Sequence, residues 1–299
     1  MRTIESTYMK ILPIVENALM FFIDSEGNIP KRGKKPKFSD KKVLALSLAA
    51  EFMPVDSENR LFNMLANSSL FENHGYIERS VYKRRRRNLY HYYEKILSSL
   101  SMQLAPYEDA FIIDSFPIEI CRLARVKRAK ICSHNFVTVP SFGYCAVQMN
   151  TYFGYKLHAT YSVTGVFHQV TISTAHVSDI HYLQDIRDSF KNRIFIGDKG
   201  YLSHDIQLDL FHRDGIRLFT TKRSNQKAGQ YPRVFRKLRK RIETLFSQLC
   251  DQFMIKRNYA KQFVGLATRI LSKIVALTVA QYQNKFVNNK NINAVKYAF

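Results

Sequence analysis

Residues 110–114 read Ala-Phe-Ile-Ile-Asp, a short apolar run that ends in a carboxylate, and the character of the chain changes at this run. Before it, apolar residues recur at helical spacing and no glycine-punctuated strand pattern appears. After it, short apolar runs alternate with helical segments. The sequence therefore predicts a domain boundary near residue 105, between an all-helical part and a part that holds a sheet.

The part after the boundary has the order strand, hairpin, helix, strand, helix, strand, helix. The runs 155–163 and 166–174 are typical of strands, and Thr164-Gly165 between them is a hairpin signal. The other expected strands are 110–113, 193–196 and 216–221, and the expected helices are 182–190, 205–213, 233–254 and 263–282. This order predicts an α/β fold, a mixed sheet with flanking helices.

The part before the boundary is expected to be a small all-helical domain. Helical spacing covers residues 8–22, a segment from 39 that Pro54 ends, 57–65 and 79–104. Ser39 and Asp40 suit the start of the second helix because both are good caps. The expected domains are thus residues 1–105, all helical, and residues 106–299, which hold the sheet and the C-terminal helices.

Three acids stand out for their positions. Asp114 follows a buried-looking strand, and Asp198 follows Ile194-Phe195-Ile196-Gly197 and is flanked by two glycines. A carboxylate at the end of an apolar strand is costly to bury without a partner or a cation, although capping of an ordinary turn explains either aspartate equally well. Glu243 lies at the edge of the apolar stripe of the helix 233–254, where an ion pair with Arg239 is the structural alternative.

The three acids together are more specific than each alone. Phosphoryl transfer without a protein nucleophile uses two divalent ions ~3.5–4 Å apart, held by hard oxygen ligands. Rigid strands and a helix position such ligands better than loops do. We therefore expect Asp114, Asp198 and Glu243 to be both the metal ligands and the catalytic residues. An additional site at His176 and His181 is not expected, because Asp179 between them is better suited to capping a helix.

The charge balance favours a polyanionic partner. There are 46 Lys+Arg against 24 Asp+Glu, a formal net charge of +22, and contact with nucleic-acid phosphates releases condensed counterions. A generally basic soluble protein or one bound to an anionic membrane surface is the alternative. No signal peptide and no membrane-spanning run is expected, and the four dispersed cysteines favour reduced thiols in the cytoplasm.

Several basic residues are candidates for DNA contact. The run 83–87 reads Lys-Arg-Arg-Arg-Arg between tyrosines, and cations with interleaved aromatics suit phosphate contact and stacking. Residues 31–42 and 233–241 are two further basic stretches, the second directly before Glu243. The residues expected at the DNA are Lys83, Arg84, Arg85, Arg86, Arg87, Lys156, His158, Lys199, Arg236 and Arg239.

Four segments resemble those of bacterial insertion-sequence DDE transposases, closest to the group numbered nine-eighty-two. They are Ile-Ile-Asp-Ser-Phe-Pro at 112–117, Phe-Gly-Tyr-Lys-Leu-His at 153–158, Ile-Gly-Asp-Lys-Gly-Tyr at 196–201 and Arg-Ile-Glu-Thr-Leu-Phe-Ser-Gln-Leu at 241–249. The resemblance extends over essentially the whole chain. It places Asp114, Asp198 and Glu243 at the family's three metal-binding acids.

The resemblance implies a ribonuclease-H-like catalytic core in residues 106–299 and two Mg²⁺ ions, for which Mn²⁺ substitutes. It implies double-stranded DNA as the partner, both as terminal inverted repeats and as target, no membrane partner, and a homodimer in the active complex. It also implies a bacterial cytoplasmic, nucleoid-associated location, with residues 1–105 binding the DNA ends. One departure concerns the Tyr-Arg-Glu-Lys signature of related transposases: Arg239 and Glu243 fit it, but Arg236 replaces the tyrosine and Cys250 the lysine.

Three other functions fit parts of the pattern. A ribonuclease-H-like nuclease that cuts without joining would use the same acids, and only a strand-transfer assay separates the two. A DNA-binding protein without catalysis, such as the relic of a mobile element, has no reason to retain all three acids. An RNA-binding protein is less favoured, because the sequence has neither an RNP-type strand signature nor a GXXG loop.

Overall fold

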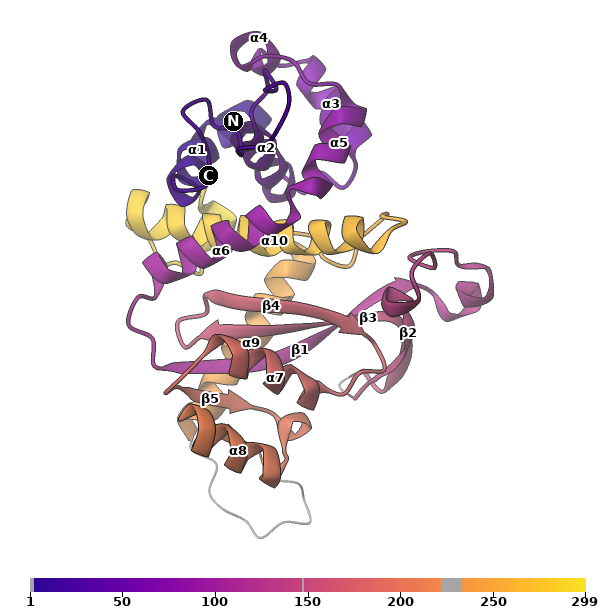
Figure 1. Cartoon of the computed structure of the whole chain (residues 1–299), viewed down its shortest axis with the longest axis vertical. Coiled ribbons are helices and arrows are strands. Elements are labelled where there is room, and N and C mark those ends of the chain that lie inside the picture. Colours follow the sequence, from indigo (N-terminus) through magenta and orange to yellow (C-terminus); the bar gives the residue numbers. More distant parts are fainter. Residues whose placement is uncertain (1–2, 147, 222–232) are drawn as a thin grey trace. The chain divides into compact units, whose positions relative to one another are not determined.

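The computed structural model describes residues 3–146, 148–221 and 233–299, except the side chains of residues 233, 234 and 236. Its contacts group the chain into two compact units (Figure 1). We call Ala105–Ser247 the sheet unit, and Met1–Leu104 together with Gln248–Phe299 the helical unit. The chain first passes from the helical unit to the sheet unit between Leu104 and Ala105. Residues from Gln248 onward are grouped with the N-terminal helices, and α10 (Phe263–Tyr282) packs against three of those helices.

The sheet unit contains all the strands among the described residues. The strands are β1 (Ala110–Cys121), β2 (Ser141–Cys145), β3 (Asn150–Ser162), β4 (Phe167–Thr174), β5 (Ile194–Gly197) and β6 (Arg217–Thr220). The helices are α7 (Tyr182–Ser189), α8 (His204–Asp214) and α9 (Arg233–Asp251), which continues into the helical unit. Short 3₁₀ turns occur at Leu123–Arg128 (η1), Phe136–Thr138 (η2), Asp179–His181 (η3) and Lys199–Tyr201 (η4).

The sheet is mixed, as predicted. β3 pairs antiparallel with β1, β4 and β2, whereas β1, β5 and β6 run parallel. The strand order is β2-β3-β1-β5-β6, and β4 also pairs with β3, off this path. The antiparallel strands β1, β3 and β4, followed by β5 and β6 parallel to β1, form a ribonuclease-H-like sheet. The predicted hairpin is present, and Gly165 with φ 92° provides the left-handed residue that its turn needs.

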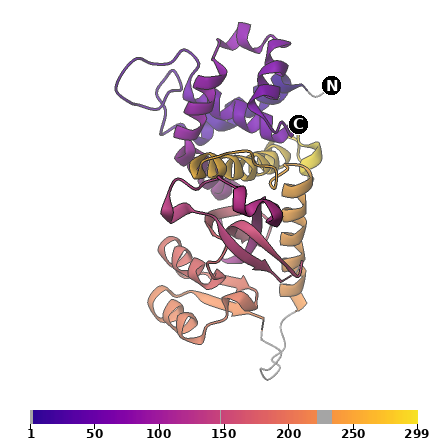
Figure 2. The same cartoon turned by 90° about the vertical axis from the view of Figure 1, so that its right-hand side faces the viewer.

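Helices cover both faces of the sheet, α9 on one face and α7 with α8 on the other (Figure 2). Alternate residues of a strand point to opposite faces. On β1, Phe111 and Ile113 face α7 and α8, where they join a core with Phe195, Tyr182 and other apolar residues. Phe116 of the opposite face stacks on a ring of α9, at 4.9 Å between centroids. This division decides which side of the sheet each functional side chain reaches.

The helical unit holds α1 (Ile4–Ala18), α2 (Asp40–Phe52), α3 (Glu58–Ala66), α4 (Leu70–His74), α5 (Arg79–Asn88), α6 (Tyr90–Leu104) and α10 (Phe263–Tyr282), which a π turn at Gln283–Val287 and a 3₁₀ turn at Val295–Tyr297 follow. The helix predicted for 79–104 is interrupted at Leu89, so that α5 and α6 are separate. Helix α4 was not predicted.

Helix α10 is the core of the helical unit. Every residue from Gly265 to Gln281 is buried, because α2, α5 and α6 all pack against this helix. Phe263–Val287 has the length and composition of a membrane span, with a hydropathy of 1.7, contrary to the expectation that no run is apolar enough. Most of this segment is buried inside the protein, as is typical of a core helix.

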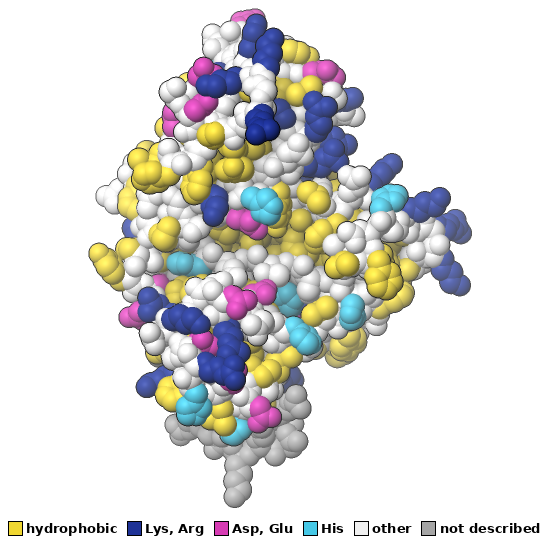
Figure 3. Space-filling view, in the orientation of Figure 1, with side chains coloured by type: hydrophobic (Ala, Val, Ile, Leu, Met, Phe, Trp, Pro, Cys, Tyr) yellow, Lys and Arg dark blue, Asp and Glu magenta, His cyan; other side chains and the backbone are white. Residues whose placement is uncertain are grey.

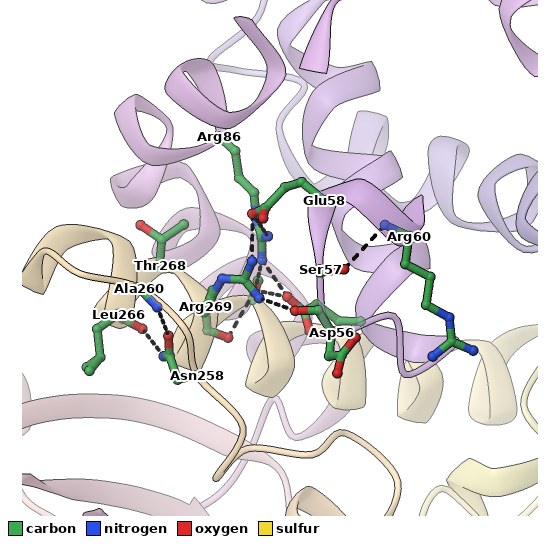
Figure 4. A network of polar contacts seen from close by, with 12 residues as sticks. Asp56, Ser57, Glu58, Arg60, Arg86, Asn258, Ala260, Leu266, Thr268 and Arg269 are labelled. Atoms are coloured by element: carbon green, nitrogen blue, oxygen red, sulfur yellow. Dashed lines mark hydrogen bonds and ion pairs between the residues drawn. The ribbon is translucent and has the colours of Figure 1, made fainter. Parts of the chain in front are cut away.

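Charged side chains inside the helical unit connect α10 to the N-terminal helices. Glu51 of α2 accepts a bond from Arg86 of α5 and pairs with Lys273 Nζ of α10 at 2.5 Å. Arg269 of α10 reaches Glu58 Oε1 at 2.7 Å and donates to the Asp56 carbonyl at 2.9 Å (Figure 4). Burial alone would raise the pKa of Glu51, but Lys273 and Arg86 outweigh burial and lower that pKa to about 2.

Candidate active site

The register of β1 and β5 brings two of the predicted acids side by side. Ala110, Phe111 and Ile112 lie opposite Ile194, Phe195 and Ile196 in parallel pairing. Two residues further along each chain are Asp114 and Asp198, and neighbouring strands are ~4.8 Å apart. The two aspartates therefore lie at one level of the sheet.

Asp114 is not at the end of its strand, and that expectation was wrong. β1 continues to Cys121 because β3 pairs with it throughout, with Ala159 opposite Asp114. β5 stops at Gly197, so Asp114 lies where β1 extends beyond its parallel neighbour. The acid is thus held by a rigid central strand and faces the space left by the end of β5.

The surroundings of Asp114 disfavour its negative charge. Burial raises the pKa of Asp114 to about 7, and the neighbouring carboxylates Asp198 and Asp179 add to this. The opposing contributions are a hydrogen bond of 2.8 Å from the Ser115 amide to Asp114 Oδ1 and the positive charge of Arg239. The positive charge around Asp114 is therefore too small to offset the cost of ionising this buried carboxyl group.

Asp198 caps the 3₁₀ turn that follows β5. Its Oδ1 accepts a bond of 2.8 Å from the Gly200 amide. A side-chain carbon at Gly200 would lie 2.9 Å from Asp198 Oδ1 and 3.1 Å from Asp179 Oδ2. Gly200 therefore leaves room for the approach of two carboxylates, and Asp179 is a third acid beside Asp114 and Asp198.

Asp179 is the residue that sequence reasoning placed wrongly. It does not cap the helix after it, since Ser178 occupies the cap position of η3. Instead its Oδ1 lies 3.0 Å from Lys156 Nζ and 3.8 Å from His158 Nδ1. The sequence alone carried no signal for this position, because Lys156 and His158 are distant from Asp179 along the chain.

His158 does not lie at the surface, so its expected contact with DNA is wrong. Its side chain is 2 % exposed, stacks on Tyr182 and is 2.9 Å from Ser173 Oγ through Nε2. Burial lowers the pKa of His158 to about 4, despite the opposing effect of Asp179. Lys156 is half-buried, and its Nζ also donates to the Val177 carbonyl at 2.9 Å.

Glu243 lies on α9, whose apolar side is fixed to the sheet. Phe246 stacks on Phe116 and meets Tyr161 edge-on at 5.8 Å. Phe116 is two residues after Asp114 and so shares its face of β1, while Glu243 is one turn before Phe246. Glu243 is exposed, and the alternative ion pair with Arg239 is not among the described contacts. The described contacts also include none between Glu243 and either aspartate.

These acids suit a divalent cation. Within the described residues no three His, Cys, Asp or Glu side chains already form a metal site. Asp114 and Asp198 nevertheless offer adjacent hard oxygen ligands, and a cation between them would supply the positive charge that Asp114 lacks. The carboxylate oxygens of these acids and the raised pKa of Asp114 both fit a bound divalent cation.

The basic run 83–87 has two sides. Lys83 and Arg84 are exposed, as expected for DNA contact. Arg86 is buried and paired with Glu51, so its expected contact with DNA is wrong. The helical period places this residue of the run on the side of α5 that faces the core. Arg85 bonds Asp40 Oδ1 at 2.6 Å, and Arg87 bonds Gln262 Oε1 at 2.8 Å.

Other predicted DNA contacts lie near the acids. Lys199 is exposed directly after Asp198, and Arg239 is half-buried on α9. The Arg236 side chain and the loop 222–232 lie outside the described residues. The stretch 31–42 is partly neutralised, because Lys31 pairs with Asp40, Lys35 with Asp24 and Lys41 with Glu16.

Comparison with known proteins gives the family. A family model described as the transposase DDE domain matches residues 106–279. No curated protein matches the chain. The solved structure of a Mos1 transposase paired-end complex with left transposon end is 11% identical, covers 85% of this chain and 81% of that chain, and has a TM-score of 0.21. The family match covers more than half of the 299 residues and includes Asp114, Asp198 and Glu243, and the chain therefore belongs to the DDE transposase family.

Proposed function

We propose that this transposase cleaves the terminal inverted repeats of an insertion sequence and joins them to target DNA, by metal-dependent phosphoryl transfer. The observation that carries the proposal is the pair Asp114 and Asp198. They lie level on adjacent parallel strands, and the pKa of Asp114 is raised to about 7 by burial first and by Asp198 next. A phosphodiester beside these two aspartates would lie next to a cation that a rigid part of the fold holds in place.

Asp114, Asp198 and Glu243 would hold two Mg²⁺ ions, or Mn²⁺ in their place. When bound, such ions lower the pKa of an attacking water or 3′-hydroxyl and stabilise the leaving oxygen. Glu243 completes the ligand set from α9, and its exposed carboxylate is not held by an ion pair with Arg239. Arg239 and Lys199 flank the acids with positive charge that suits the scissile strand.

The helical unit would bind the DNA ends. Its exposed Lys83 and Arg84 supply phosphate contacts, and pairing of two ends calls for a homodimer in the active complex. Acting on bacterial DNA, the protein would work in the cytoplasm at the nucleoid. The relation to the group numbered nine-eighty-two remains part of this proposal.

The test is a reaction with the element's own terminal DNA. The full-length protein is incubated with labelled terminal repeats, a supercoiled target and Mg²⁺ or Mn²⁺, and products are mapped at single-nucleotide resolution. We expect cuts at the repeat ends and covalent end–target products, both lost with EDTA. Cutting without joined products would establish a nuclease, and neither activity with any divalent ion would contradict the proposal.

A further inference from the structure

A basic lobe projects from the sheet unit between β1 and β3 (Figure 1, magenta). We call residues 122–149 the β1–β3 lobe; it includes η1, η2 and β2, and Val147 within it lies outside the described residues. The three basic stretches recognised in the sequence do not include it.

The lobe carries cations without carboxylates. Arg122, Arg125, Lys127, Arg128 and Lys130 fall within nine residues, and no Asp or Glu occurs between Glu119 and Asp179. All five side chains are exposed, and none has an ion pair within the described parts of the chain. Figure 3 shows Lys and Arg side chains gathered on this lobe at the right-hand edge. Five exposed cations without carboxylate partners on a short segment suit a polyanionic partner.

An apolar tip lies beside the cations. Phe136 is 96% exposed and Val137 is 81% exposed. The tip is held in shape, because Asn135 Oδ1 accepts from the Val137 amide at 3.0 Å and the Tyr155 hydroxyl donates to the Thr138 carbonyl at 2.6 Å. A phenylalanine fixed in water is typical of a contact surface, and proteins that bend DNA insert such side chains between base steps.

The base of the lobe is part of the sheet. β2 pairs with β3 from Ser141 opposite Gly154 to Cys145 opposite Asn150. Ser141 Oγ also accepts from the His176 amide at 2.9 Å, three residues before Asp179. The lobe is therefore attached firmly to β3 and to the segment that leads from β4 to Asp179.

The spacing between lobe and acids suits a duplex. The lobe begins where β1 ends, seven residues after Asp114, and at ~3.3 Å per residue this is roughly 23 Å. A duplex rises ~3.4 Å per base pair along each strand, so roughly seven base pairs would separate the two contacts.

We propose that the β1–β3 lobe binds the sugar–phosphate backbone of duplex DNA, independently of sequence, alongside the phosphodiester at Asp114 and Asp198. This inference rests on the proposed function for its partner. Arg125, Lys127 and Arg128 on η1 contact phosphates, and Phe136 makes the apolar contact in the groove.

The experiment measures DNA binding by the full-length protein in EDTA, so that catalysis plays no part. The triple variant Arg125→Ala/Lys127→Ala/Arg128→Ala is compared with Lys191→Ala/Arg213→Ala/Arg217→Ala, which removes three exposed cations elsewhere in the same unit. Each is titrated with terminal-repeat and with unrelated duplex across a salt series. Thermal melting verifies that both variants fold.

We expect the lobe variant to bind both duplexes at least about tenfold more weakly, with an unchanged preference ratio and a salt slope lower by roughly 2–3. Phe136→Ala should weaken binding further without changing the slope. The control should bind within about threefold of wild type. Loss of affinity confined to the terminal repeat, or unchanged affinity for both duplexes, would overturn the proposal. The weaker DNA binding of the lobe variant can be observed even if the protein does not cleave DNA. Failure of the proposed transposase activity and failure of the proposed DNA binding by the lobe are therefore distinguishable.

Discussion

Asp114 is an acid whose charge the protein disfavours, and this has a measurable effect on stability. Burial first, and Asp198 next, raise the pKa of Asp114 to about 7 from 3.8. A raised folded-state pKa means that the neutral form is favoured: full stability is present below pH ~4 and is lost as pH rises through ~7. In a metal-free buffer we expect Asp114→Asn to melt a few degrees above wild type at pH 8. The difference should vanish near pH 4, and a constant difference at all pH values would contradict this account.

Removal of each acid should separate chemistry from binding. We expect Asp114→Ala, Asp198→Ala and Glu243→Ala each to reduce metal-dependent cleavage by more than the ~100-fold that loss of an outer-shell partner costs. DNA affinity in EDTA should stay within about threefold, since phosphate contacts do not depend on the metal. Near-normal cleavage by one variant would remove that residue from the site.

Asp179 should tune Asp114 through its charge. Asp179 contributes, after burial and Asp198, to the raised pKa of Asp114, and it lies 3.0 Å from Lys156. In Asp179→Asn we expect the pH midpoint of Mn²⁺ binding to move downward, because Asp114 then ionises more easily. Titrations with Mn²⁺ between pH 5 and 9 measure this shift, and Asp179→Glu is the matched control that keeps the charge. An unmoved midpoint with a folded variant would show that Asp179 serves packing alone.

At the scale of elements, α5 has a buried side that packs in the helical unit and an exposed side that we propose contacts DNA. We expect Arg86→Ala to destabilise the protein by about 1–3 kcal/mol, because buried Glu51 would lose this hydrogen-bonded partner while it keeps Lys273. Lys83→Ala/Arg84→Ala should change stability by less than about 0.5 kcal/mol. The same double variant should lower the salt slope of DNA binding by roughly two. Denaturant unfolding and DNA titration of both variants measure the contrast, and equal destabilisation would contradict it.

Sequence predicted the elements whose patterns are local. The strands of the hairpin, the strand before Asp198 and the long helices follow from period and turn residues, and the mixed sheet follows from their order. The β1–β3 lobe was missed because its 3₁₀ turns have no apolar period. The predicted end of β1 was wrong because β1 continues beyond Asp114 only through its pairing with β3, and this pairing is a long-range contact.

The site was predictable in part for the same reason. Two aspartates after apolar runs were recognisable, but the parallel register that aligns them depends on the pairing of β1 with β5, which are distant in sequence. The burial of His158 and Arg86 was not predicted, because each depends on a partner distant in sequence. His158 stacks on Tyr182, and Arg86 pairs with Glu51. The position of Asp179 depends likewise on Lys156.

At the scale of the whole molecule, the helical unit is discontinuous in sequence. We expect a fragment of residues 1–104 to lack a cooperative thermal transition, because Glu51 and Arg86 lose Lys273 and Ser272, and α2 and α6 lose α10. Joining residues 248–299 to that fragment through a flexible linker should restore the transition, as measured by circular dichroism on heating. A cooperative transition in the shorter fragment would show that α10 is dispensable.

The late position of α10 also bears on how the protein is made. When Leu104 leaves the ribosome, the helix that fills the centre of its unit has not been translated, and it is complete only at Tyr282. At ~5–20 residues per second, the roughly 180 intervening residues take on the order of 10–35 s. During that interval α2, α5 and α6 present an unfilled apolar face and a carboxylate, Glu51, that still lacks Lys273. A nascent chain therefore carries the exposed cations of α5 long before it has the folded unit that positions them.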